Sequence, residues 1–163
     1  MFFVNTLYLN ISKIKSKTFK LNEKQMSFFN DYLKNICEET NLLMLDNFIQ
    51  HGNTTCLWHS IAVAYYAYCF SQFFNIKCDE KSLIYGALLH DYFLYDWHIH
   101  DKSHRFHGFK HPKTALNNAL KHYSLNKREI DIIKNHMFPL TLVPPHHRES
   151  ILVNLSDKIC SSP

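Results

Sequence analysis

The sequence predicts an all-α fold, because it is rich in apolar residues, poor in turn residues and patterned at helical spacing. Hydrophobic residues make up 46% of the chain and aromatic residues 15%, which supplies the apolar surface of a packed core. Only 3 Gly and 5 Pro are present, too few for the turns of an all-β fold. Apolar positions recur at helical spacing along most of the chain. The length of 163 residues is typical of a single domain.

The N-terminal part predicts two helices. Residues 1–20 mix apolar and basic positions and give no firm assignment. Asn22 is a suitable N-cap for a helix over 22–37, where apolar residues return at helical spacing. A second helix is expected over 41–49. We expect it to stop at Gly52, because glycine readily adopts the left-handed conformation that often ends a helix.

The third predicted helix carries the first histidine of interest. Thr54 or Thr55 can cap it, since a hydroxyl there can accept a hydrogen bond from an amide of the first turn. His59 lies in its first turns, beside an apolar stripe that would face the core. A lone histidine on such a helix is more often a hydrogen-bonded core residue than a ligand. His59 is therefore a candidate ligand only in combination with the other candidate residues.

The fourth predicted helix leads into the most distinctive stretch of the chain. Asp79 can cap this helix, which runs through Gly-Ala-Leu-Leu-His-Asp at 86–91 and is expected to fray near Tyr95. His90 and Asp91 thus stand at the end of an otherwise apolar helix. Burial of an imidazole beside a carboxylate costs free energy unless something compensates, and a bound cation is a common compensation.

Two further predicted helices each bring another histidine. Pro112 suits the first turn of a helix that extends through 122, because an amide has no partner there, and this puts His111 at the cap. The next helix begins after Asn126 and runs to His136. Three prolines then exclude a regular helix between them: Pro139, Pro144 and Pro145.

The last predicted helix, over 147–160, carries Asp157. With it, each candidate ligand lies on or beside a helix. Mixed imidazole and carboxylate groups that project inward from several helices are the arrangement with which helical bundles hold metal ions.

Charge and cysteine usage restrict the class of protein. The net charge of +4 suits an anionic substrate but is too small to indicate nucleic acid, which we consider an unlikely partner. The 5 Cys are scattered and form no Cys-x-x-Cys pair, which argues against a disulfide framework and fits a reducing cytoplasm. The first residues do not form a secretory signal, and no apolar stretch is long enough to span a membrane. We expect a soluble cytoplasmic protein.

The order of the candidate ligands resembles the HD-domain metal-dependent phosphohydrolase superfamily. The resemblance rests on six positions: His59, His90, Asp91, His111, His136 and Asp157. Their contexts also match, since the first histidine opens His-x-x-x-Val-Ala, His111 precedes a proline and Asp157 precedes a lysine. The resemblance covers roughly 45–160. It implies an HD-domain-like helical bundle over 41–163, with residues 1–40 as an N-terminal extension that packs on the core.

The resemblance also implies a metal centre. One divalent ion would be bound by three residues: His59, His90 and Asp157. A second ion would be bound by His111 and His136, with Asp91 as a bridge between the ions. Water activated by the ions would attack phosphorus, and the residues of the doublet and of the second ion, His90, Asp91, His111 and His136, would be catalytic. If only one ion binds, His111 and His136 could instead contact phosphate or transfer protons. The ligands accept Fe, Mn, Co, Ni, Zn or Mg without distinction.

A loop over 96–108 follows the His-Asp doublet and is rich in His and aromatic residues, as functional loops often are. Cationic side chains in and after this loop are the expected phosphate contacts: Arg105, His107, Lys110 and Lys158. Arg105 and Lys110 could equally be solvated surface charges. The aromatic side chains of the loop region could stack on a nucleobase or cover the core, and the second role is the more common: Trp97, Phe106 and Phe109.

The expected function is hydrolysis of a phosphate ester or anhydride of a small molecule, with a nucleotide as the expected class. The chain departs from many members of the superfamily because Tyr92-Phe93-Leu94 follows the doublet where a small residue, Gly and Lys are usual. It also lacks the Gly-Tyr-Pro signature, which disfavours the cyclic-di-GMP phosphodiesterase branch and leaves a resemblance to small stand-alone bacterial HD hydrolases.

A catalytically silent nucleotide-binding or metal-binding sensor is the alternative function. A nucleic-acid-binding helical protein is the more distant one. The sequence does not predict the oligomeric state.

Overall fold

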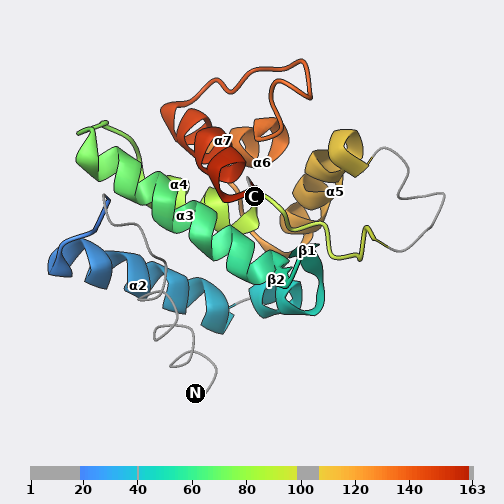
Figure 1. The fold of residues 1–163 in the computed structure, drawn as a ribbon, viewed down its shortest axis with the longest axis horizontal. Helices are drawn as coiled ribbons and strands as arrows, with labels where there is room; N and C mark the ends of the chain where they lie inside the picture. The colour runs from blue at the N-terminus through green and yellow to red at the C-terminus, as the bar shows by residue number, and fades with distance from the viewer. Residues whose placement is uncertain (1–18, 40, 99–106, 162–163) are drawn as a thin grey trace.

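The computed structural model describes residues 19–39, 41–98 and 107–161 and confirms the all-α bundle in a single domain (Figure 1). Its elements are α2 Glu23–Glu39, the 3₁₀ helix η1 Asn41–Asn47, β1 Ile49–His51, β2 Thr54–Thr55, α3 Cys56–Phe73, α4 Glu80–Leu89, α5 His107–His122, α6 Lys127–Asn135 and α7 Arg148–Ser161. Within the described part of the chain, no helix has both the length and the apolar character needed to cross a bilayer.

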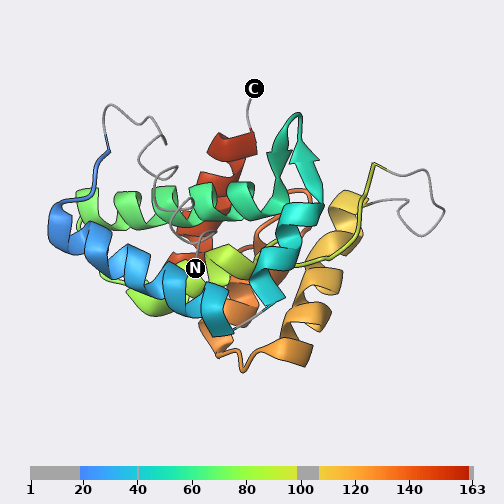
Figure 2. The same cartoon turned by 90° about the horizontal axis from the view of Figure 1, so that it is seen from below.

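Helix α3 is the centre of the bundle. Most of its side chains are buried, so it is apolar on all sides rather than along one stripe, as expected of a helix enclosed by others. Helices α4 and α7 pack against it. On another side α2 lies along it, with Phe29 fully buried against Tyr65 and Tyr68 of α3 (Figure 2). The central helix therefore fixes the position of His59 on its first turns.

The caps of the helices follow the sequence prediction. The side chain of Asn22 accepts a hydrogen bond from the backbone amide of Gln25 at 2.9 Å, just before α2 begins. Thr55 caps α3 and Asp79 caps α4, each by accepting a bond from an amide in the first turn. Asn126 caps α6 and forms a reciprocal capping box with Glu129. The starts of these helices were therefore readable from the sequence.

A close approach between α4 and α6 brings two candidate ligands together. A Cβ at Gly86 would lie 2.5 Å from Cδ1 of Ile132, so only glycine permits this spacing of the two helices. His90 follows the last residue of α4, and His136 follows the last residue of α6. The glycine thus sets the distance between the ends from which both histidines project.

The second predicted helix, over 41–49, is present but shorter than expected and of another type. A 3₁₀ helix covers Asn41–Asn47, with Leu42 and Leu45 buried at the spacing of three residues that suits it. An antiparallel hairpin of β1 and β2 follows. Gly52 has the expected positive φ, 55°, but it lies in the turn of this hairpin and not at the end of a helix.

Two helix boundaries also differ from the prediction. Helix α4 ends at Leu89 rather than near Tyr95, because the four residues after it are all fully buried and a turn lets them point into the core: His90, Asp91, Tyr92 and Phe93. Helix α5 begins at His107 rather than at Pro112. Proline has a helical φ and loses only one amide hydrogen bond there, so the helix tolerates it near its start. His111 consequently lies within α5 and not at its cap.

Candidate metal centre

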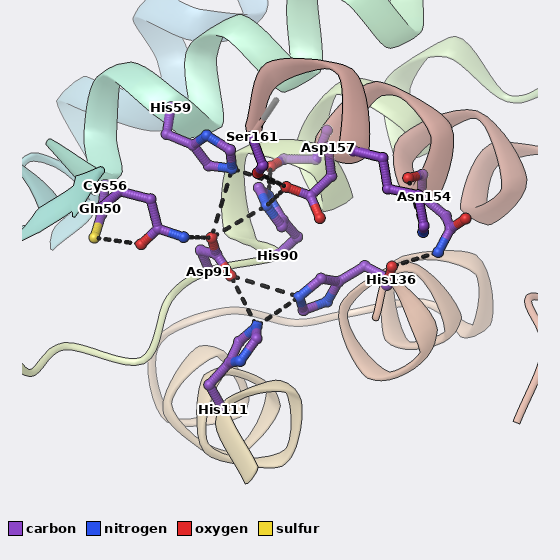
Figure 3. A network of polar contacts seen from close by, with 12 residues as sticks. Gln50, Cys56, His59, His90, Asp91, His111, His136, Asn154, Asp157 and Ser161 are labelled. Atoms are coloured by element: carbon purple, nitrogen blue, oxygen red, sulfur yellow. Dashed lines mark hydrogen bonds and ion pairs between the residues drawn. The ribbon is translucent and has the colours of Figure 1, made fainter. Parts of the chain in front are cut away.

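Six side chains from separate helices converge at one buried point (Figure 3). They are His59 of α3, His90 and Asp91 after α4, His111 of α5, His136 after α6 and Asp157 of α7. None is more than 8% exposed. The structure therefore brings together all six residues that the sequence singles out as candidate ligands.

The carboxylate of Asp91 faces two different groups of histidines. Its Oδ2 lies 3.3 Å from Nε2 of His90 and 3.7 Å from Nε2 of His59. Its Oδ1 lies 3.2 Å from Nε2 of His111 and 3.5 Å from Nε2 of His136. Asp91 thus stands between two halves of the cluster, with one oxygen for each half.

Asp157 completes one half of the cluster from the far side. Its Oδ1 lies 2.9 Å from Nε2 of His59 and 3.7 Å from Nε2 of His90. In the other half, the Nε2 atoms of His111 and His136 lie 2.7 Å apart. Each half therefore offers nitrogen and oxygen atoms that point to a common centre.

Backbone carbonyls fix the ring orientation of two histidines. Nδ1 of His90 donates to the carbonyl of Ala87 at 2.7 Å, and Nδ1 of His136 donates to the carbonyl of Ile133 at 2.8 Å. A carbonyl can only accept, so the proton of each neutral ring lies on Nδ1. The lone pair of Nε2 is then directed into the cluster, as in histidines that bind metals.

The pKa values of the cluster favour ionised carboxylates. Burial alone would lower the pKa of the His90 imidazole, but the negative charge of Asp91 outweighs burial and raises this pKa well above its ordinary value. Burial would raise the pKa of Asp91, yet the charge of His90 and the nearby imidazoles of His111 and His136 hold it well below its usual range. The pKa of Asp157 is also lowered, against burial, by the bond from His59. Burial lowers the pKa of His136, which favours its neutral form.

These residues fit a divalent metal ion. Nε2 of His90 and Oδ1 of Asp91 are buried atoms without a hydrogen-bond partner among the residues that the structure describes, and such atoms are costly in a protein interior. Two groups have ligand atoms close enough to share an ion: His59 with His90 and Asp157, and His90 with Asp91 and His136. Ionised carboxylate and neutral imidazole are the forms that bind a divalent metal, so His90 would release the proton that Asp91 favours when an ion binds beside it.

Gln50 is a contact of the cluster that the sequence did not identify. It lies on β1, is buried, and its side-chain amide donates to Oδ2 of Asp91 at 2.8 Å. Its own oxygen accepts from the thiol of Cys56 at 3.2 Å. The hairpin that follows η1 is what brings Gln50 to this position. An isolated glutamine between Ile49 and His51 gives no signal in the sequence.

A cavity of about 700 Å³ opens on the cluster, a volume typical of small-molecule sites. Its lining residues are Gln50, Asp91, Trp97, Gly108, His111, Met137, Pro139, Leu140, Asp157, Lys158 and Ser161. Three candidate ligands, Asp91, His111 and Asp157, therefore reach the cavity wall together with Trp97 of the predicted aromatic loop. The other three candidate ligands do not line the cavity.

The predicted phosphate contacts have different positions. Lys158 lines the cavity, and its ammonium donates to the carbonyl of Phe138 at 2.6 Å. Lys110 is exposed on α5 and does not line the cavity. Arg105 and the side chain of His107 lie outside the described residues, as does Phe106. Phe109 is 56% exposed, so it does not cover the core.

Comparison with known proteins gives this chain no family. No protein-family model, curated protein or solved structure matches it. What the centre does must therefore be inferred from the chemistry of its own residues.

Proposed function

We propose that this chain is a metal-dependent phosphohydrolase that cleaves a phosphate ester or anhydride of a small molecule. The observation that carries the proposal is the position of Asp91, whose two oxygens face two separate groups of histidine nitrogens beneath a cavity of small-molecule size. The order of the six residues resembles the HD-domain phosphohydrolase superfamily. Geometry and sequence pattern thus support the same class of chemistry.

The residues have distinct roles in this proposal. His59, His90 and Asp157 would hold one divalent ion, while His111 and His136 would hold a second, with Asp91 between them. Bound there, the ions would supply a water ionised near neutral pH and would compensate the charge on the phosphoryl oxygens. Lys158 would add one positive charge at the cavity wall. The carbonyls that hold His90 and His136 keep both rings ready for the ions without rearrangement.

Metal analysis and a substrate screen test the proposal. The purified protein, dialysed against each of Mn, Fe, Co, Ni, Zn and Mg, is analysed for bound metal and assayed against phosphomonoesters, phosphodiesters and nucleotides. We expect metal uptake and turnover in the wild type, and loss of turnover in His90→Ala. Metal uptake without turnover of any substrate would support the silent sensor instead. Absence of metal uptake would overturn both.

The number of ions has a separate test. We expect His111→Ala and His136→Ala to bind about half the metal of the wild type if each half of the cluster holds its own ion. His59→Ala would then lose the other ion. Unchanged stoichiometry in His111→Ala together with lost turnover would show that one ion suffices, and that His111 contacts the phosphate or transfers a proton.

A further inference from the structure

The cavity above the cluster is lined by two chemically different sets of residues. One set is polar and consists of ligand side chains and Gln50. The other set, named here the apolar wall, consists of Trp97, Met137, Pro139 and Leu140. A substrate in the cavity would therefore have its phosphate at the ligands and its organic part against an apolar surface.

The apolar wall is held firmly relative to the cluster. Met137, Pro139 and Leu140 belong to the segment between α6 and α7. The amide of Asn154 on α7 donates to the carbonyl of His136 and to that of Phe138, the latter at 2.7 Å. Three residues further along α7 is Asp157. The wall and this ligand are thus joined through one helix, which makes the apolar surface a preformed part of the site.

The wall also packs closely on α5. Cδ2 of Leu140 lies 2.9 Å from the position that a Cβ would take at Gly108, and Cε of Met137 lies 3.9 Å from it. Glycine therefore lets Leu140 sit against the helix that carries His111. The side chain of Leu140 is nevertheless 43% exposed, so it retains surface for a ligand.

The charge of the cavity matches a single phosphate. Of the described residues that line it, Lys158 is the one cation. Its ammonium also donates to the carbonyls of Phe138 and Asn154, at 2.6 and 3.3 Å. Substrates with several phosphates or polar rings need many charged and hydrogen-bonding partners. The described part of the apolar wall offers few such groups.

We infer that the substrate is a phosphomonoester of an alcohol with an apolar group, such as an aryl or branched alkyl group, which binds against Trp97, Met137, Pro139 and Leu140. This inference rests on the proposed phosphohydrolase function and names its substrate class. In the reaction, a bond forms between the water oxygen and phosphorus, and the bond between phosphorus and the ester oxygen breaks. One proton of the water is transferred to the departing alcohol, and inorganic phosphate is the second product.

Matched substrates test the inference. The metal-loaded protein is assayed with 1-naphthyl phosphate, with glycerol 2-phosphate and with AMP, each of which carries one phosphate. We expect kcat/KM to be highest for naphthyl phosphate. Leu140→Ser is expected to lower kcat/KM for naphthyl phosphate by a factor about ten times larger than the factor by which it lowers kcat/KM for glycerol 2-phosphate. The change should lie mainly in KM, because an apolar contact is lost. Leu142→Ser is the control, since Leu142 belongs to the same segment, is 90% exposed and does not line the cavity.

A binding measurement separates failure of the inference from failure of the proposed function. Calorimetry with 1-naphthylmethylphosphonate, which has no ester bond to cleave, is carried out on the wild type and on Leu140→Ser. Weaker binding to the variant supports the apolar subsite even if no ester is hydrolysed, in which case only the proposed function fails. Equal binding by both proteins, or a preference for AMP or glycerol 2-phosphate in an active enzyme, overturns the inference and leaves the phosphohydrolase intact.

Discussion

Two buried aspartates of this protein, Asp91 and Asp131, have opposite surroundings. Asp91 faces four histidine nitrogens, and its Oδ1 has no hydrogen-bond partner within the described part of the chain. Asp131 on α6 accepts bonds at Oδ2 from the backbone amides of His146 and His147, at 2.9 and 3.0 Å, and from the hydroxyl of Ser150. Its Oδ1 accepts from Asn135 at 2.6 Å and lies 3.1 Å from Nδ1 of His146, whose side chain is exposed.

The difference shows that burial alone does not mark a functional carboxylate. Asp131 satisfies amides at the start of α7, so its negative charge is used to join α6 to α7. Asp91 faces imidazoles instead. The lone pairs of these imidazoles and those of the Asp91 carboxylate could all bind a cation. We therefore assign the first carboxylate to the stability of the fold and the second to the chemistry of the site.

The largest effect that would sharpen this contrast is expected from Asp91→Asn. The amide keeps the shape of the side chain but removes the charge between the two halves of the cluster. We expect metal content to fall and kcat/KM to drop at least about a thousandfold, which corresponds to about 4 kcal/mol. Asp131→Asn is the matched control and should bind metal as the wild type does. Retention of metal and of activity within about tenfold in Asp91→Asn would refute the role of Asp91.

Asp131→Ala should break the fold rather than the site. It leaves the amides of His146 and His147 and the hydroxyl of Ser150 without their acceptor. We expect the free energy of unfolding in urea to decrease by about 3 kcal/mol, as for the loss of a cap together with buried hydrogen bonds. The metal bound per folded molecule should not change. A variant that is fully stable but has lost metal would reverse the two assignments.

The stability of the protein at acidic pH supplies a third test of the contrast between Asp91 and Asp131. Burial opposes ionisation of Asp131, but the bonds from Ser150 and from the amides of His147 and His146 lower its pKa from 3.8 to about 2. Its contribution is therefore complete above pH 3.8 and is lost as the pH falls through about 2. We expect the stability difference between the wild type and Asp131→Asn to shrink by about 2 kcal/mol over this range. A difference independent of pH between 5 and 2 would contradict the assignment.

The sequence predicted the candidate ligands more successfully than the segments between them. His59 lies on α3 and His90 directly follows α4, and both helices have clear N-caps, so local signals predict where each residue stands. Helix ends were less predictable, because α4 stops where four consecutive residues all enter the core, which only the tertiary structure requires. The start of α5 was missed because the preference of proline for the first turn is a statistical tendency and not a rule.

The apolar wall and the hairpin could not be predicted at all. Met137 and Leu140 lie in irregular backbone, where apolar periodicity carries no information. The hairpin of β1 and β2 has only two to three residues in each strand, too short for an alternating pattern to stand out. Its contact with Asp91 spans 41 residues of sequence. Contacts of this kind depend on how the helices pack and not on local propensity.

Substitution of Gln50, which lies in this hairpin, gives the smallest of the expected effects. It tests whether the carboxylate of Asp91 needs a hydrogen bond to hold its position. The amide of Gln50 donates to Oδ2 of Asp91, the oxygen that faces His59 and His90, so we propose that it positions this carboxylate. Gln50→Leu keeps the volume but removes the donor. We expect the dissociation constant for metal to rise about tenfold, as when other partners of metal ligands are lost, with little change in the melting temperature of the metal-free protein.

A glutamine remote from the centre provides the control for this last experiment. The side-chain amide of Gln25 donates to the side chain of Gln72 at 2.9 Å, and its backbone amide donates to the side chain of Asn22 at the start of α2. Gln25→Leu should therefore lower the melting temperature slightly and leave metal affinity unchanged. If Gln50→Leu behaves in the same way, its hydrogen bond supports only the hairpin. Asp91 would then be oriented by its histidines alone, and the contrast with Asp131, which is held by amides and a hydroxyl, would become sharper still.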